Sequence, residues 1–192
     1  DYFLDIITIF TGIGFITGLL CVFYASNGKI ETWFYGSISV LCFIFVFFYA
    51  GFYFSSLLQL IFLVLNIYGW KKWKNRKEEL PVTQMSIYST IGILFVGVIL
   101  ALILYLILTA SQYALGIEND TMSFYDSGIF TFSLIGTYLL ANRKIESWYF
   151  WILADLISIP LYYFGGLYIL SFLYFIYLLI CIKGLYSWSK EV

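Results

Sequence analysis

Charged residues are scarce in this sequence, because aspartate, glutamate, lysine and arginine together make up only 11% of its 192 residues. A soluble domain has about 25% charged residues, so a water-exposed surface over the whole chain is excluded. Histidine is absent altogether. Its absence removes the commonest metal ligand and the usual general base of an enzyme. We therefore expect no metal site, no cofactor and no enzymatic activity.

Cysteine is also rare, and its positions form no recognisable pattern. Cys21, Cys42 and Cys181 all lie within apolar stretches, and none belongs to a CxxC pair. Disulfide frameworks and zinc sites need paired or closely spaced cysteines. We expect all three to be small packing residues.

Apolar residues dominate the chain, which is 62% hydrophobic with a mean hydropathy of +0.94. A helix needs about 20 mostly apolar residues to cross a bilayer, and it satisfies its own backbone hydrogen bonds there. Runs of this kind predict seven transmembrane helices, near residues 6–25, 33–49, 52–70, 86–110, 123–141, 148–164 and 167–187. The alternating pattern of a membrane barrel is not found. The sequence predicts an all-α integral membrane protein.

Charge is distributed unevenly between the two ends of these predicted helices. All ten lysines and arginines fall near the connections 26–32, 71–85 and 142–147 or near the C-terminus. The charged residues of the opposite side are acidic: Asp1, Asp5, Glu118, Asp120 and Asp126. By the positive-inside rule, we expect a cytoplasmic C-terminus and Asp1 outside. The basic segment 71–77 is interpreted as a topology determinant beside anionic lipid, not as a nucleic-acid site.

An internal repeat divides the chain. A shift of 115 residues aligns 29–73 with 144–188 without a gap, and fifteen of the 45 positions are identical. Both copies start on the same side of the membrane, so one extra helix must connect them. This predicts a parallel 3+1+3 repeat like that of the SWEET sugar facilitators, with units at 1–73 and 113–192 and a linker at 74–112. A repeat of this kind indicates a transporter with a site between the units and alternating access.

Few polar residues lie within the predicted spans, and such residues are functional candidates because burying them in hydrocarbon is costly. Gln59 and Asn66 are seven residues apart, so they share one helix face. Trp148, Trp151 and Asp155 share a face in the same way. Tyr174 is equivalent to Gln59 in the repeat, and we expect it at the same depth.

A second polar stripe lies in the fifth predicted span, where Asp126, Ser133 and Thr137 face one side. We assign Asp126 and Ser133 to a gate or to the pocket wall. Together with the tryptophans, a buried carboxylate suits a flat aromatic ligand that carries a positive charge. Trp33, Trp70, Trp73 and Trp188 are interpreted as interfacial belt residues.

Several of these segments together resemble the PnuC family of vitamin transporters. They are Ser56–Gln59, Asn66–Trp70, Phe124–Ser127 and Arg143–Trp148, followed by Trp151. The resemblance runs from about residue 6 to Trp188. It implies facilitated diffusion of nicotinamide riboside across the bacterial plasma (inner) membrane, trapping by a cytoplasmic kinase, and a homotrimer. It also implies that Gln59, Asn66, Trp148 and Trp151 contact the substrate.

Position 155 departs from some relatives, which have asparagine where this chain has aspartate. Thiamine is a cationic aromatic like the riboside, so thiamine remains an alternative substrate, as does riboflavin. An ion-coupled carrier is a further alternative, although the few carboxylates and the missing histidine favour uncoupled transport.

Two other classes fit the sequence less well. An intramembrane aspartyl protease needs a Gly-x-Gly-Asp motif, whereas Leu153 and Ala154 precede Asp155. A structural scaffold would leave Gln59 and Asp155 without a role.

Overall fold

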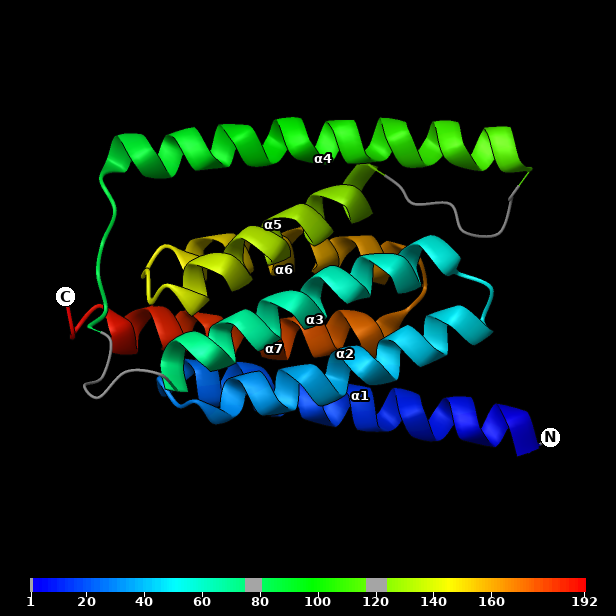
Figure 1. Cartoon of the computed structure of the whole chain (residues 1–192), viewed down its shortest axis with the longest axis horizontal. Helices are drawn as coiled ribbons and strands as arrows, with labels where there is room; N and C mark the ends of the chain where they lie inside the picture. Colours follow the sequence, from blue (N-terminus) through cyan, green and yellow to red (C-terminus); the bar gives the residue numbers. More distant parts are fainter. Residues whose placement is uncertain (1, 75–80, 117–123) are drawn as a thin grey trace.

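A computed structural model describes residues 2–74, 81–116 and 124–192. The described chain forms seven α-helices (Figure 1): α1 Tyr2–Ser26, α2 Glu31–Tyr49, α3 Tyr53–Lys74, α4 Ile87–Leu115, α5 Phe124–Ala141, α6 Ser147–Phe164 and α7 Tyr168–Trp188. The predicted all-helical architecture is confirmed. Five residues used in the orientation argument lie outside the described residues: Asp1, Arg76, Lys77, Glu118 and Asp120.

The helix bounds differ from the sequence prediction mainly at α4, which continues to Leu115 instead of ending at 110. Ser111 and Gln112 are polar but do not break a helix, and the helix ends only at Gly116, whose left-handed φ of 65° forms the C-cap. At its start, the Ser86 hydroxyl accepts a hydrogen bond from the Ser89 backbone nitrogen at 3.1 Å.

Four of the helices in the described residues are long and apolar enough to cross a membrane: α1, α2, α4 and α7. The other three are less apolar, because α3 ends in Lys71, Lys72 and Lys74 while α5 carries Asp126 and α6 carries Asp155. The prediction of membrane spans is therefore confirmed for four helices.

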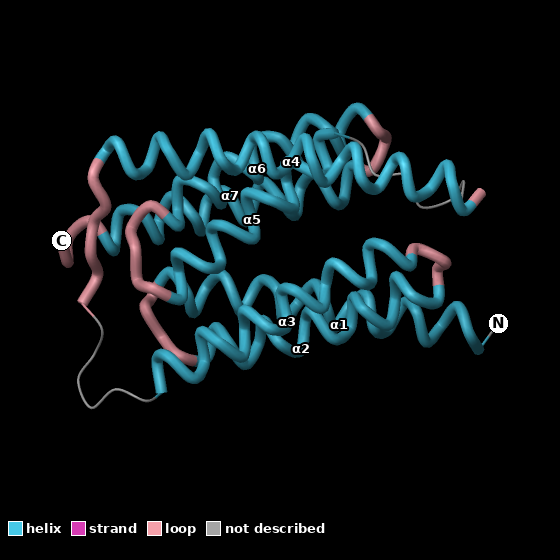
Figure 2. Tube along the Cα trace, turned by 45° about the horizontal axis from the view of Figure 1, so that its top comes forward, coloured by secondary structure: helices cyan, strands magenta, loops and turns pink. Residues whose placement is uncertain are grey.

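The helices form two groups of three with α4 outside them. α1, α2 and α3 pack together as a first unit, and α5, α6 and α7 as a second unit (Figure 2). Contacts of α1 with α7 and of α3 with α5 join the units, and α4 packs along α5. The two chain ends lie at opposite ends of the molecule (Figure 1).

A tryptophan packed on a glycine occurs at equivalent positions of the two units. In the first unit the Trp33 indole lies over Gly69, where an added Cβ would be 2.5 Å from the ring. In the second unit the Trp148 indole lies over Gly184, where the Cβ distance would be 2.6 Å. Both pairs follow the 115-residue shift. Only glycine leaves room for the ring at these helix crossings.

Two further contacts recur under the same shift. The rings of Trp33 and Trp73 meet edge to face at 5.3 Å, and those of Trp148 and Trp188 do so at 5.5 Å. The hydroxyl groups of Ser56 and Ser171 each donate to a backbone carbonyl of the preceding helix, at 3.0 and 2.8 Å.

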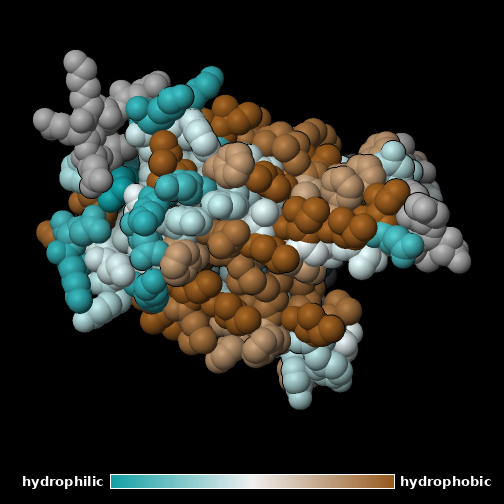
Figure 3. Space-filling model, turned by 90° about the horizontal axis from the view of Figure 1, so that it is seen from below, coloured by the Kyte–Doolittle hydropathy of each residue, from teal (hydrophilic) through white to brown (hydrophobic). Residues whose placement is uncertain are grey.

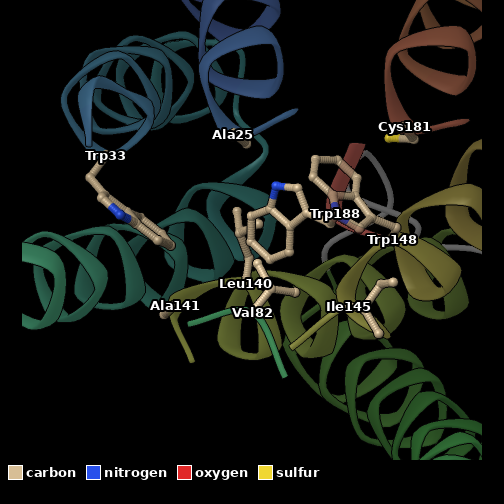
Figure 4. Close-up of a cluster of buried hydrophobic side chains, with 9 residues drawn as sticks. All are labelled: Ala25, Trp33, Val82, Leu140, Ala141, Ile145, Trp148, Cys181 and Trp188. Carbon is tan, nitrogen blue, oxygen red and sulfur yellow. The ribbon is translucent and has the colours of Figure 1, made fainter. Parts of the chain in front are cut away.

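A core of buried side chains fills the end of the molecule where the C-terminus lies (Figure 4). It consists of Ala25, Trp33, Val82, Leu140, Ala141, Ile145, Trp148, Cys181 and Trp188. Trp33 is 1% exposed and Trp188 is fully buried, so their interpretation as belt residues is wrong. Their indoles fill space between helices that the sequence alone does not place side by side.

Hydrophilic side chains gather at the same end, and we call it the basic end. Figure 3 shows hydrophilic atoms gathered there, beside a broad hydrophobic band. It holds the α1–α2 and α5–α6 connections and the C-terminus. The hydrophobic band suits contact with lipid chains.

Candidate functional site

A cavity of about 750 Å³ lies between the two units. Residues of α1, α2 and α3 line one side of it, and residues of α5, α6 and α7 line the other. None of the described lining residues belongs to α4. Its volume lies within the roughly 300–1,000 Å³ of pockets for drug-sized ligands.

Most of the residues singled out from the sequence meet at this cavity. Gln59, Asn66, Asp126, Ser133, Trp151, Asp155 and Tyr174 all line it. They come from four different helices, so the fold brings together groups that lie up to 115 residues apart in the chain. Trp148 is the predicted site residue that does not line the cavity.

Trp148 instead belongs to the buried core at the basic end, where it is 1% exposed. Its ring packs against Gly184 and meets Trp188 edge to face. This position favours a packing role, and the prediction that Trp148 contacts a substrate remains untested.

Asp155 presents a buried carboxylate in the wall of the cavity. The residue is 3% exposed, and it forms a hydrogen bond with the Cys181 thiol. Its Oδ2 atom has no hydrogen-bond partner among the described residues. A buried oxygen without a partner is costly, so a ligand that brings a hydrogen-bond donor or a positive charge is favoured there.

Asn66 lies in the part of the cavity that is lined by the first unit. Its amide nitrogen donates to the Phe62 carbonyl oxygen at 2.9 Å, which fixes the side chain on its own helix. The amide oxygen lies against Gly36, at a position where a larger residue would displace it. Gln59 is half-buried and lines the cavity two turns away. The two side chains offer amide groups along one face, as the sequence spacing predicts.

Aromatic rings form much of the remaining wall. The rings of Tyr162 and Tyr174 stack at 5.3 Å with an interplanar angle of 26°, and Tyr177 meets Tyr174 edge to face at 5.8 Å. Trp151 packs against Gly136, where an added Cβ would lie 2.9 Å from the ring. These flat surfaces suit stacking with an aromatic ligand.

Other residues of the lining were not singled out as site residues from the sequence. Cys21 and Cys181 were expected only to pack, yet both line the cavity. Tyr177 lines it as well, and its spacing of three residues from Tyr174 places both on one helix face. Cys181 is equivalent to the predicted site residue Asn66 under the 115-residue shift, so the repeat could have identified Cys181 as a lining residue.

The cavity lining contains carboxyl groups. Among the described lining residues, these belong to Asp126 and Asp155, and none is lysine or arginine. Asp126 lies in the first turn of α5, at the end opposite the basic end. Such a lining attracts cations and repels anions.

The chain is similar in sequence to proteins that are named as vitamin transporters. The chain is 28% identical to the nicotinamide riboside transporter PnuC of Escherichia coli over 93% of its length and 84% of the relative's. It is 23% identical to the riboflavin/roseoflavin transporter RibM of Streptomyces davaonensis, over 92% of this chain and 82% of RibM. These relatives are named as transporters, which supports the prediction of a transporter over an enzyme.

The fold has a counterpart among solved structures. A crystal structure of the vitamin B3 transporter PnuC matches with a TM-score of 0.71 and 20% identity, over 96% of this chain and 82% of that one. The family model described as nicotinamide mononucleotide transporter matches residues 8–190. Since that match covers nearly the whole sequence, the chain belongs to the nicotinamide mononucleotide transporter family, and the resemblance to PnuC is confirmed.

Proposed function

We propose that this chain carries nicotinamide riboside across the membrane by facilitated diffusion. The observation that carries the substrate assignment is the Asp155 carboxylate, whose Oδ2 atom lacks a described partner in a cavity walled by aromatic rings. The nicotinamide ring of the riboside is flat and positively charged. Stacking, cation–π contact and attraction to the carboxylate would all favour it.

The charge of the cavity favours the riboside over its mononucleotide. A phosphate group usually binds arginine, lysine or a helix N-terminus. The described lining offers two carboxylates, Asp126 and Asp155, and no basic side chain. The phosphate of a mononucleotide would be repelled and would lose its hydration without compensation. Once inside the cell, phosphorylation of the riboside by a kinase would therefore prevent its return.

The transport mechanism that fits this arrangement is alternating access between two repeated units. In support, contacts such as Trp33 on Gly69 and Trp148 on Gly184 recur under the 115-residue shift. A cavity between two similar units opens to either side when one unit rocks against the other. The boundaries 1–73, 74–112 and 113–192, and the likeness to the SWEET plan, belong to this proposal.

We further propose that α3, α5 and α6 cross the membrane like the other four helices. They lie side by side with spanning helices within each unit, and seven crossings agree with the opposite positions of the two chain ends. The basic end would then face the cytoplasm. The first residue of the chain would lie outside.

A homotrimer is the assembly that we propose from the resemblance. α4 packs against α5, while many of its apolar residues remain exposed, such as Ile91, Phe95 and Leu106. These residues would contact lipid or a neighbouring copy. Native mass spectrometry in detergent tests the assembly, and a monomeric or dimeric mass would contradict it.

Thiamine and riboflavin remain the alternative substrates. Thiamine also carries a cationic ring, so Asp155 would favour it for the same reason. Riboflavin has no positively charged ring, and RibM supports it only as the substrate named for a relative.

Calorimetric titration of the purified protein tests the substrate assignment. Nicotinamide riboside, nicotinamide mononucleotide, thiamine and riboflavin are titrated in turn. We expect binding of the riboside and none of the mononucleotide. Binding of thiamine without binding of the riboside would overturn the riboside as substrate, but would still agree with recognition of a cationic ring. Heat with riboflavin alone would overturn both.

A further inference from the structure

Arg143 occupies an unusual position in the turn between α5 and α6. Its φ of 50° is left-handed, and it is the only non-glycine residue with positive φ in the described chain. That backbone conformation is unfavourable for an arginine, whose Cβ approaches the following carbonyl oxygen. Two hydrogen bonds from the segment before α4 hold the turn, because Thr83 accepts from Ile145 and donates to the Arg143 carbonyl oxygen, at 3.1 and 3.0 Å.

The guanidinium group of Arg143 joins the two units. It lies between the rings of Trp73 and Trp188, at 5.1 and 5.2 Å from their centroids. It also donates to the Gly28 carbonyl oxygen at 3.2 Å and forms an ion pair with Glu191 at 3.3 Å. Trp73 and Gly28 belong to the first unit or its connections, whereas Trp188 and Arg143 itself belong to the second.

These residues are related by the repeat. Trp73 and Trp188 are equivalent under the 115-residue shift, and so are Gly28 and Arg143. Gly28 has the same left-handed conformation, with a φ of 67°. A Cβ on Gly28 would lie 3.3 Å from the Arg143 Nη2 atom. The space between the two indoles therefore holds one guanidinium, and the equivalent position of the other unit is left without a side chain.

Reciprocal polar contacts lie beside this arginine. Lys72 of α3 donates to the Asn142 side chain in the second unit. Lys183 of α7 reaches the Asn27 side chain in the first unit, at 3.5 Å. Asn27 and Asn142 are also equivalent in the repeat. The last helix of each unit thus contacts the connection between the first two helices of the other unit, at the basic end.

This arrangement lies beyond the cavity, toward the basic end. Trp33, Leu140 and Cys181 line the cavity and also belong to the buried core at that end. The core contains Trp188, on which Arg143 is stacked. A substrate leaving the cavity at the basic end would have to pass through this core, and the two units would have to separate there.

We propose that Arg143 is the latch of the gate at the basic end, and that its withdrawal from between Trp73 and Trp188 opens the cavity on that side. The inference rests on the proposed transport function, since it assigns a residue to one half of the transport cycle. Glu191 is 49% exposed, so the ion pair can exchange with water, whereas the Arg143 side chain is 7% exposed and leaves the indoles only when the two units separate. The latch stabilises the state that is closed at the basic end.

The native cysteines of the cavity provide a direct test. Cys21 and Cys181 line the cavity, and Cys42→Ala removes the third cysteine. The test variant is Arg143→Gly, because glycine adopts the left-handed conformation without strain and stands at the equivalent position 28. Right-side-out and inside-out membrane vesicles are treated with a membrane-impermeant cationic thiol reagent. Labelling is measured as the mass of the intact protein.

We expect Arg143→Gly to raise the labelling rate from the basic side by about tenfold, the effect of about 1.4 kcal/mol, and to lower it from the opposite side. A merely destabilised protein would be labelled faster from both sides. Lys29→Ala removes an exposed positive charge from the same end and should leave both rates unchanged. Equal rates in Arg143→Gly and the parent protein, or faster labelling from both sides, would overturn the latch.

Arg143→Lys covers the case in which the glycine variant does not fold. It keeps the positive charge but cannot stack a planar group between two indoles. We expect a labelling rate from the basic side between those of the parent and of a fully opened gate, and a parental rate would contradict the proposal. The labelling does not use the riboside, so a failure of the substrate assignment would appear in calorimetry alone.

Discussion

Asp155 and Trp151 line the same cavity and would attract a cationic ring in different ways. Asp155 contributes charge from a buried position, where the effective dielectric is lower than in water and a nearby cation gains several kcal/mol at most. Trp151 contributes a flat face held in place by packing on Gly136. The charge distinguishes cationic from neutral ligands, whereas the ring surface binds both.

This difference predicts the effect of Asp155→Asn. The riboside and its reduced dihydro form have nearly the same shape, but only the oxidised form has a positively charged ring. We expect the parent protein to bind the oxidised form at least about tenfold more tightly, a difference of about 1.4 kcal/mol. Asp155→Asn should remove that preference, as measured by calorimetry with both ligands.

The matched control is Asp5→Asn, which removes an exposed carboxylate that is not part of the cavity lining. It should keep the preference for the oxidised form. If Asp155→Asn also kept it in full, the carboxylate would have no role in recognising the charge.

The two tryptophans of the sixth helix should respond differently to substitution. Trp151 lines the cavity, so Trp151→Ala should weaken riboside binding by about 1–2 kcal/mol through lost cation–π contact. Trp148 fills the core, so Trp148→Ala should lower the free energy of unfolding by about 3–5 kcal/mol. Calorimetry and thermal unfolding in detergent separate the two effects. A stable Trp148→Ala protein with weakened binding would restore Trp148 to the site.

At the scale of helices, close packing of α2 on α3 and of α6 on α7 depends on Gly69 and Gly184. An alanine at Gly184 would place its Cβ 2.6 Å from the Trp148 ring. Overpacking of this kind costs about 1–3 kcal/mol. We therefore expect Gly184→Ala to lower the melting temperature. Gly12→Ala is the control, because nothing lies within 4 Å of its added Cβ. Equal melting temperatures for both variants would contradict the packing.

The sequence predicted the helices well because each apolar run ends at polar residues or glycine, as at Gly51 and Gly166, which both have positive φ. Seven of the eight site residues predicted from the sequence line the cavity, and the prediction assumed that polar groups within spans face inward. Trp33 and Trp188 were misjudged, because tryptophan is equally suited to an interface and to a core. Only the helix crossings decide between the two.

The contacts of Arg143 could not be predicted in the same way. Its partners are Gly28, Trp73, Trp188 and Glu191, which come from three separate segments of the chain. In the sequence, Arg143 reads as one of several basic residues that set the orientation. Its role becomes visible only when both units are assembled.

At the scale of the whole molecule, the two ends differ in charge, and this predicts the orientation in the membrane. Single cysteines are introduced at exposed positions of the two ends, as Gly165→Cys and Lys190→Cys, in a background without native cysteines. An impermeant thiol reagent applied to intact cells should label the first and not the second. The reverse pattern would place the basic end outside.

We propose that the chain lets nicotinamide riboside equilibrate across a membrane without an ion gradient. Uptake of labelled riboside into proteoliposomes, with and without ionophores that collapse sodium and proton gradients, tests this most directly. We predict uptake that stops when the internal and external concentrations are equal and that the ionophores do not change. Accumulation above the external concentration would contradict facilitated diffusion, and its loss on adding the ionophores would identify an ion-coupled carrier.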